Sequence, residues 1–271
     1  MPSISARRID DRFRDLRARQ GKGLVVYLTA GDPSLEATGE LVQAVAHGGA
    51  DVIELGVPFS DPLADGPVIQ RASERALRAG TTLRGILQHF PSWRQRVDVP
   101  IILFSYYNPI LQYGVEKFAH DFSAAGADGA LVVDLSGEEA EGYVQAMRQH
   151  KLDTIFLGSP TSTDERLQQA AGLSSGFLYL ISRTGVTGEQ QEISATVPSL
   201  VARARALTKL PLAVGFGLAH PRQVREVQQW ADAAVVGSAL VRAIEEHYKA
   251  DGAGAIEALV RWLASGADND A

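Results

Sequence analysis

One carboxylate, that of Glu54, interrupts a short apolar run that is typical of a β-strand. Val52, Glu54 and Gly56 alternate with Ile53 and Leu55, so a strand would place Glu54 on the same face as a valine. A carboxyl group among apolar neighbours loses hydration and keeps its proton to higher pH, which suits a general acid-base. An ion-paired glutamate of the core is the alternative interpretation.

Two further acids, Asp61 and Asp65, follow this strand in a loop that contains Pro58, Pro62 and Pro67. Proline restricts the backbone, so this loop could hold its carboxylates in fixed places. A turn that uses Asp61 or Asp65 only for local backbone hydrogen bonds is the alternative. The segment therefore predicts a site built on Glu54 and Asp65.

Glycines mark a second candidate site near the end of the chain. Gly215 and Gly217 follow one apolar run, and Gly237 with Ser238 follows the next. Glycine lets backbone N–H groups approach an anion closely, so these segments predict phosphate binding, with simple tight turns as the alternative. A third segment, residues 182–188, is also rich in glycine and could form a lid over the substrate, rather than a plain connection.

Short β-branched runs alternate with helical patterns along the chain, which is typical of βα units with a parallel sheet. Eight strands are expected, at Leu24–Leu28, Asp51–Leu55, Pro100–Phe104, Ala130–Asp134, Thr154–Leu157, Phe177–Ile181, Pro211–Val214 and Ala233–Val236. Helices are expected at Glu36–Ala46, Ile69–Arg78, Val115–Ala124, Glu138–Gln149, Asp164–Ala170, Pro198–Leu207 and Pro221–Gln229. This order predicts an α/β fold of the (β/α)₈ TIM barrel type, with a doubly wound open sheet as the alternative.

We expect a single domain over residues 1–271, because no linker of low complexity divides the chain. Residues 1–23 contain Ile9, Phe13 and Leu16 at helical spacing among arginines and aspartates, so they predict an amphipathic helix that could plug one end of the barrel. Residues 265–271 are expected to form a frayed tail. In a barrel the functional residues lie at the carboxyl ends of the strands, where Glu54 and both glycine segments fall.

Composition limits the function classes. The chain has no cysteine, so disulfides, thiolate catalysis and cysteine-ligated metals are excluded. Its formal net charge of -6 offers no broad attraction to nucleic acid. The arginine-rich start does not resemble a signal peptide, and no apolar run approaches the ~20 residues of a membrane span. We therefore expect a cytoplasmic protein that binds neither nucleic acid nor membrane.

Several motifs together resemble those of the tryptophan synthase alpha chains, which are indole-3-glycerol-phosphate lyases. They are the segments 27–33, 54–70, Tyr106-Tyr-Asn-Pro109, 182–188, 214–217 and 236–238, in the order and spacing of that family. The resemblance covers nearly the whole chain. It implies a (β/α)₈ barrel that cleaves indole-3-glycerol phosphate to indole and glyceraldehyde 3-phosphate in tryptophan biosynthesis, with no metal or cofactor of its own.

The resemblance also implies roles for individual residues. Glu54 corresponds to the general acid-base, and Asp65 to the residue that binds the indole N–H and stabilises the cationic intermediate. Tyr179 corresponds to a tyrosine beside the reacting side chain, although a tyrosine of the barrel core is as good an interpretation. Thr187 corresponds to a threonine of the lid. The phosphate pocket corresponds to Gly188, Gly215, Gly217, Gly237 and Ser238, and Phe216 and Leu103 are expected as apolar walls for indole.

A partner is implied as well. The family works beside a beta subunit that carries pyridoxal phosphate, so an α₂β₂ heterotetramer is expected, with contacts from Asp61, Tyr106, Asn108 and Pro109. Ser136-Gly137 stands where proline is common in the family, and Glu189–Glu192 is unusually polar for the lid. These departures concern partner contact and lid closure rather than the chemistry.

Two other functions remain open at this stage. An isomerase of a phosphorylated sugar derivative would keep the glycine pocket but would not need Glu54 and Asp65 at this spacing. A protein that mainly activates a catalytic subunit would not need two retained acids. Cleavage of indole-3-glycerol phosphate, with and without a beta subunit, separates these possibilities.

Overall fold

The computed structural model describes residues 8–181, 195–215 and 217–266. Within them, all strands are parallel and run in the order β5-β4-β3-β2-β1-β9-β8-β7-β6. Their bounds are β1 Gly23–Thr29, β2 Val52–Gly56, β3 Ile101–Ser105, β4 Gly129–Val132, β5 Asp153–Ile155, β6 Leu157–Gly158, β7 Leu178–Ile181, β8 Leu212–Gly215 and β9 Ala233–Val236. β1 pairs with both β2 and β9, so the first and last strands meet.

The fifth expected strand, Thr154–Leu157, is found as two short pieces. β5 pairs with β4 and β6 pairs with β7, and only Phe156 separates the two pieces. The sheet is therefore continued at this point by the covalent chain between β5 and β6. The other expected strands match observed strands within a few residues. The predicted (β/α)₈ TIM barrel is confirmed, and the doubly wound open sheet is excluded because the strands return to β1.

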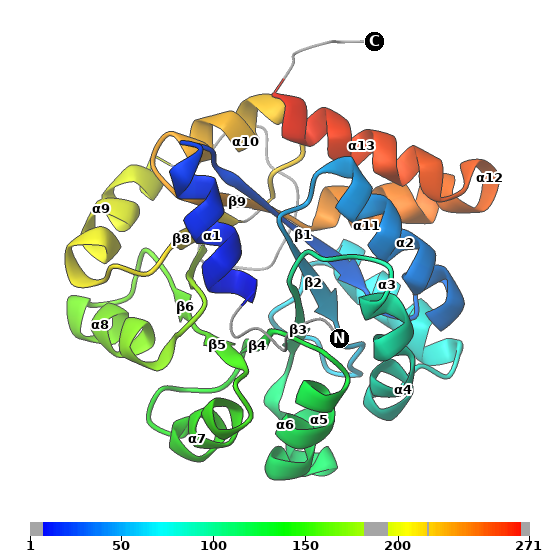
Figure 1. The fold of residues 1–271 in the computed structure, drawn as a ribbon, viewed down its shortest axis with the longest axis horizontal. Helices are drawn as coiled ribbons and strands as arrows, with labels where there is room; N and C mark the ends of the chain where they lie inside the picture. Colours follow the sequence, from blue (N-terminus) through cyan, green and yellow to red (C-terminus); the bar gives the residue numbers. More distant parts are fainter. Residues whose placement is uncertain (1–7, 182–194, 216, 267–271) are drawn as a thin grey trace.

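Helices surround the strands on the outside (Figure 1). They are α2 Leu35–Gly48, α3 Pro67–Arg78, α4 Leu83–Arg94, α5 Tyr107–Tyr113, α6 Val115–Ala124, α7 Glu141–Gln149, α8 Asp164–Leu173, α9 Val197–Leu207, α10 Pro221–Gln228, α11 Ser238–Ala243, the π-helical turn η1 Ile244–Tyr248, α12 Lys249–Asp251 and α13 Ala253–Ser265. Side chains of Ser34, Thr82 and Thr163 accept hydrogen bonds from N–H groups at the starts of α2, α4 and α8, which stabilises those starts. No helix among these described elements is long and apolar enough to cross a membrane.

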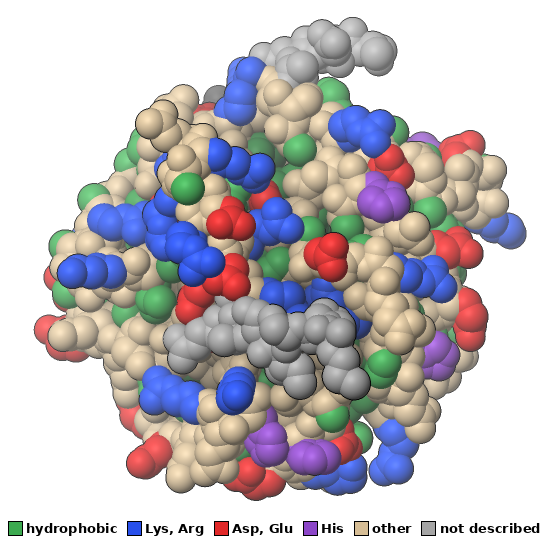
Figure 2. Space-filling view, viewed as in Figure 1, with side chains coloured by type: hydrophobic (Ala, Val, Ile, Leu, Met, Phe, Trp, Pro, Cys, Tyr) green, Lys and Arg blue, Asp and Glu red, His purple; other side chains and the backbone are tan. Residues whose placement is uncertain are grey.

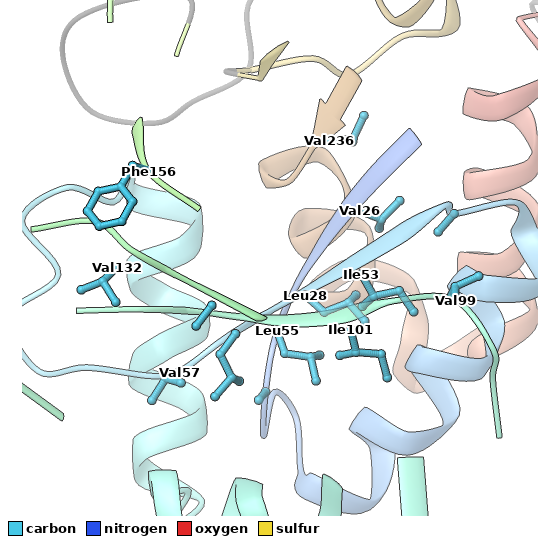
Figure 3. Close-up of a cluster of buried hydrophobic side chains, with 14 of the residues drawn as sticks. Val26, Leu28, Ile53, Leu55, Val57, Val99, Ile101, Val132, Phe156 and Val236 are labelled. Carbon is cyan, nitrogen blue, oxygen red and sulfur yellow. The ribbon is translucent and has the colours of Figure 1, made fainter. Parts of the chain in front are cut away.

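Alternate residues of each strand face the helices or the barrel interior. Val26, Leu28, Ile53 and Leu55 are buried in the layer between strands and helices (Figure 3). Val52, on the other face of β2, belongs to the cluster inside the barrel. The predicted alternation along β2 is therefore confirmed, and it directs Glu54 inward.

The amino-terminal helix α1, Arg8–Ala18, packs across one end of the barrel. Ile9, Phe13 and Leu16 are buried in the same cluster as the inward side chains of the strands, as expected for a plug. Leu16 lies next to Gly23, the first residue of β1, so α1 covers the end where the strands begin. The opposite end of the barrel is left for the site.

Charged side chains cover the outer surface of α1. Figure 2 shows basic side chains gathered over this helix, with acidic ones among them. Arg12 and Arg19 approach Asp51, which precedes β2, at 3.8 and 3.4 Å. Arg8 also bonds Asp128 before β4. These ion pairs attach the plug to the residues that precede β2 and β4.

Candidate active site

Glu54 lies inside the barrel near the carboxyl end of β2. It is opposite Tyr27 of β1 in the strand register, so both side chains point into the barrel. Glu54 is only 1% exposed and borders a small cavity. The walls of that cavity are Tyr27, Glu54, Ile69, Phe104, Tyr179, Gly217, Val235, Gly237 and Ser238.

The environment of Glu54 favours its protonated form. Among the described residues, no hydrogen-bond partner reaches its buried Oε1 atom. Burial raises the pKa of Glu54 to about 8, because the ionised carboxylate would lose its hydration. Within residues 8–181, 195–215 and 217–266, no basic side chain pairs with Glu54, so this part of the chain does not contain the ion-paired core glutamate considered from the sequence. Glu54 is instead an acid whose protonated form is favoured at pH 7 and which faces a cavity.

Asp65 is held by the loop between β2 and α3. Its backbone N–H donates to the Pro62 carbonyl at 3.0 Å, and the Gln70 side-chain amide donates to its carbonyl at 2.9 Å. Helix α3 begins two residues later at Pro67. The carboxylate accepts a hydrogen bond at 3.1 Å from the Tyr106 hydroxyl, which itself accepts from the Ala64 N–H at 2.9 Å.

Burial and this hydrogen bond act on Asp65 in opposite directions. Burial raises the pKa of Asp65 to about 6, although the Tyr106 hydroxyl lowers it by stabilising the ionised form. Oδ1 of Asp65 is buried and has no hydrogen-bond partner among the described residues. At pH 7 the two acids therefore differ: Asp65 is mostly ionised, whereas Glu54 is mostly protonated. The Asp65 carboxylate can accept a hydrogen bond or stabilise a cation, while Glu54 can donate a proton.

Two tyrosines reach over glycines on neighbouring strands. A Cβ atom on Gly56 would lie 2.0 Å from the Tyr27 hydroxyl oxygen, and a Cβ on Gly215 would lie 2.5 Å from that of Tyr179. Both rings therefore need glycine beside them. Burial is the main cause that raises the pKa of both hydroxyls, and the charge of Asp65 raises the pKa of Tyr27 further, so Tyr27 and Tyr179 stay neutral.

The glycine segments lie where the barrel was expected to bring them. Gly217, Gly237 and Ser238 border the same cavity as Glu54. Gly217 has a φ of 80°, a left-handed conformation that favours glycine. Gly215 ends β8 and lies beside Tyr179. Thr187, Gly188 and Phe216, together with the expected lid, lie outside the described residues.

One expected wall residue is wrong. Leu103 is fully buried between β3 and the helices, so it cannot contact a ligand inside the barrel. Its neighbour Phe104 borders the cavity instead and packs edge-on against Tyr27, with ring centroids 5.3 Å apart. The strand alternation explains the error, because adjacent residues point to opposite faces.

Three further residues, Tyr27, Ile69 and Val235, border the cavity but were not among the expected site residues. Tyr27 and Val235 could have been found from the alternation of β1 and β9. Ile69 lies in the first turn of α3, and its position depends on how that helix packs, which the sequence pattern alone does not give.

The residues expected at a partner surface differ in exposure. Asp61 and Asn108 are exposed and Pro109 is half-buried. Tyr106 is 5% exposed, and its hydroxyl points to Asp65. The structure thus gives Tyr106 a place beside the acid that its interpretation as a contact residue did not anticipate.

A larger cavity, of about 320 Å³, lies elsewhere, beside α8. Its walls include Ser136, Gly137, Gln169 and Arg166, but neither Glu54 nor Asp65. Within the described parts of the chain, no cluster of three or more acidic or histidine side chains could hold a metal ion. Glu54, Tyr179 and two of the glycines expected to bind phosphate, Gly217 and Gly237, border the smaller cavity and not this one.

Known proteins share this sequence and fold. A family profile described as "Tryptophan synthase alpha chain" matches residues 13–265. The tryptophan synthase alpha chain of Solibacter usitatus is 54% identical over 240 residues, covering 89% of this chain and 90% of the relative. That of Geobacter sulfurreducens is 50% identical over 244 residues, covering 90% and 92%.

Solved structures agree. A structure of Mycobacterium tuberculosis tryptophan synthase superposes with a TM-score of 0.89 at 39% identity, covering 97% of this chain and 98% of that one. Tryptophan synthase subunit alpha from Legionella pneumophila gives 0.87 at 40% identity, covering 98% and 100%. With a matching profile over most of its length and relatives at such identity, this chain belongs to the tryptophan synthase alpha chain family.

Proposed function

We propose that this chain, a lyase of the alpha chain family, cleaves indole-3-glycerol phosphate to indole and glyceraldehyde 3-phosphate, with Glu54 and Asp65 as its catalytic residues. The observation that carries the proposal is the pair of buried acids at the carboxyl end of the barrel. Their pKa values are raised to about 8 and about 6, so they hold different protonation states near pH 7.

The reaction is a retro-aldol cleavage with two proton transfers, one from Glu54 to the substrate and one from the substrate back to Glu54. Protonated Glu54 donates to C3 of the indole ring, and the ring nitrogen becomes positively charged. Asp65, as a carboxylate, accepts the N–H hydrogen bond and stabilises that charge. The Glu54 carboxylate then removes the proton of the side-chain hydroxyl next to C3.

The second step breaks the carbon–carbon bond. The carbon that bears the hydroxyl becomes the aldehyde of glyceraldehyde 3-phosphate, and the bonding electrons return to the ring to give neutral indole. Glu54 ends protonated, as it began, so atoms and charge balance without a cofactor in this chain. Tyr179 is proposed to contact the reacting side chain, and its position at the border of the same cavity supports this role.

The other end of the substrate is a phosphate. Gly215, Gly217, Gly237 and Ser238 are proposed to bind it, together with Gly188, because three of them border the cavity that contains Glu54. Phe216 is proposed as a wall for indole and Thr187 as the lid residue that approaches the acids. These roles follow from the family resemblance and the chain positions.

A beta subunit with pyridoxal phosphate is the proposed partner, in an α₂β₂ complex in the cytoplasm. The proposed contacts are Asp61, Tyr106, Asn108 and Pro109. Two apolar side chains in the same segments support an interface there, because Leu63 is 85% exposed and Leu111 is 53% exposed. Large exposed apolar side chains often mark surfaces that bind other proteins.

The test is release of glyceraldehyde 3-phosphate from indole-3-glycerol phosphate, with and without a tryptophan synthase beta chain. Glu54→Gln and Asp65→Asn should each lower kcat by about 10²-fold or more, as expected for lost acid-base or electrostatic catalysis. Glu74→Gln, on the exposed side of α3, is the matched control and should keep full activity. Losses below tenfold in the first two variants would contradict their assigned roles.

A further inference from the structure

The segment Tyr27–Pro33 contains a buried acid to which the proposed mechanism gives no role. Asp32 follows β1 and its side chain is 4% exposed. Arg75 of α3 binds it with two hydrogen bonds, Nε to Oδ1 at 2.9 Å and Nη2 to Oδ2 at 2.7 Å. The two planar groups thus form a bidentate pair, which fixes their relative orientation.

Arg75 has a third contact on a different element. Its Nη1 atom donates to Oε1 of Glu245 in η1 at 2.7 Å. Arg71, one turn earlier in α3, reaches the other oxygen of Glu245 at 3.5 Å. One guanidinium therefore joins the segment after β1, helix α3 and the helical run that continues from α11.

Two of these elements begin at opposite ends of the proposed site. Helix α3 starts at Pro67, two residues after Asp65, and α11 starts at Ser238, which borders the cavity. Between the cavity and Arg75 the two helices are in contact through Val68, Ile69, Ala72 and Val241. Arg75 extends this apolar contact outward with fixed polar bonds.

We infer that Arg75 is a positioning residue that fixes the separation between Asp65, at the indole end of the site, and Ser238, at the phosphate end. The inference rests on the proposed function for the identity of the two ends. It adds a role for Asp32, Arg75 and Glu245, none of which borders the cavity. A substrate whose two ends are joined binds well only when both subsites lie at the right distance.

A fixed separation between the two subsites can be recognised from binding affinities. Each half of the substrate, indole or inorganic phosphate, should bind its own subsite regardless of the separation. The intact substrate should lose affinity when the separation is no longer fixed. The informative quantity is the product of the two half-ligand Kd values divided by the Kd of the intact substrate.

The test variant removes both charges, Asp32→Asn with Arg75→Gln, because removing only one would leave a buried charge without its partner. Binding is measured on the full chain in a Glu54→Gln background, where intact indole-3-glycerol phosphate is turned over too slowly to be consumed during the measurement. We expect the ratio to fall at least tenfold while each half-ligand Kd stays within twofold. Arg75→Lys, which keeps the charge but not the planar fork, should give an intermediate ratio.

Arg94→Gln is the matched control. Arg94 also pairs with a buried aspartate, Asp128, but it does so at the end of the barrel that α1 covers. This variant should unfold at a lower temperature and leave the ratio within twofold, which separates lost stability from lost positioning.

An unchanged ratio, or half-ligand affinities that fall as much as that of the intact substrate, would overturn the inference. Because the readout is binding, it does not depend on cleavage. Failure of the wild-type chain to release glyceraldehyde 3-phosphate would instead overturn the proposed function, and the two failures are therefore distinguishable.

Discussion

The Tyr106 hydroxyl donates a hydrogen bond of 3.1 Å to Oδ2 of Asp65, across 41 positions of the sequence. The same hydroxyl accepts from the Ala64 N–H, so the tyrosine binds both the carboxylate and the backbone beside it. Tyr106 follows β3, whereas Asp65 lies in the loop after β2. The residue that follows a neighbouring strand thereby fixes the orientation of the Asp65 carboxylate.

Tyr106→Phe is expected to shift the pH dependence of cleavage. The hydrogen bond lowers the pKa of Asp65, so its loss should raise that pKa and move the acid limb of kcat/KM to higher pH. We expect a loss of about 3- to 10-fold at pH 7 and a stability cost of about 1 kcal/mol for one lost hydrogen bond. An acid limb that stays in place would show that the tyrosine has no influence on Asp65.

The wild-type chain should show a bell-shaped profile of kcat/KM against pH. Activity needs Asp65 ionised and Glu54 protonated, so it should rise through a pKa of about 6 and fall above a pKa of about 8. The measurement is steady-state cleavage between pH 5 and 9 at about constant ionic strength. A rise that continues above the upper pKa would mean that Glu54 acts first as a base.

The strands and the inward direction of Glu54 could be predicted because both depend on local alternation. The period of two predicts that Val52 faces the barrel interior with Glu54 and that Ile53 faces the helices, and the structure confirms both directions. The error at Leu103 has the same origin, since a shift of one residue reverses the face. Local pattern is sufficient where the position within the strand is known.

Helices were harder to predict than strands. The sequence pattern did not identify α4, which contains Pro91, a residue that normally argues against a helix interior. It also gave no bounds for α5 or for the run from α11 to α13, although the buried residues of α13, Ile256, Val260 and Leu263, lie at helical spacing. The fifth strand is interrupted at Phe156 where its pairing changes from β4 to β7, and the local sequence does not indicate this change of partner.

The contacts that tune the site were not readable from sequence at all. The pairs Tyr106–Asp65 and Arg75–Asp32 each join residues about 40 positions apart, and only the folded barrel brings them together. Tyr27 could have been placed inside the barrel by its alternation. The dependence of its hydroxyl position on the bare backbone of Gly56 required coordinates.

Glu54→Gln should stabilise the fold at alkaline pH while it lowers kcat by about 10²-fold or more. The folded-state pKa of Glu54 is raised from 4.5 to about 8, so the folded chain binds more protons than the unfolded chain between these values. Stability from this group is therefore present at low pH and is lost as pH rises toward 8. At pH 8.5 we expect the free energy of unfolding of Glu54→Gln to exceed that of wild type by about 3 kcal/mol, given ~1.4 kcal/mol per pKa unit and a discount for relaxation.

Urea unfolding of both chains at pH 5 and pH 8.5 checks this. At pH 5 the difference should shrink to below about 1 kcal/mol, because the wild-type carboxyl is then protonated in the folded state. Equal differences at both pH values would mean that Glu54 is not desolvated, and its proposed role as the proton donor would lose its physical basis.

Phe13→Ala tests whether the α1 plug contributes stability without contributing to the chemistry. Phe13 is 2% exposed, and its ring lies 5.9 Å from that of Phe177 inside the barrel. Truncation should leave a cavity and lower the free energy of unfolding by about 3–5 kcal/mol, whereas Phe13→Leu should lower it clearly less.

Val52 lies between this layer and Glu54 on the same face of β2, so the reacting groups should stay in place. We therefore expect a lower urea midpoint and a kcat within twofold of wild type at 20 °C. A kcat that falls with destabilisation in Phe13→Ala but not in Phe13→Leu, while both chains remain fully folded, would show instead that the plug sets the geometry of the interior layer beneath the acids.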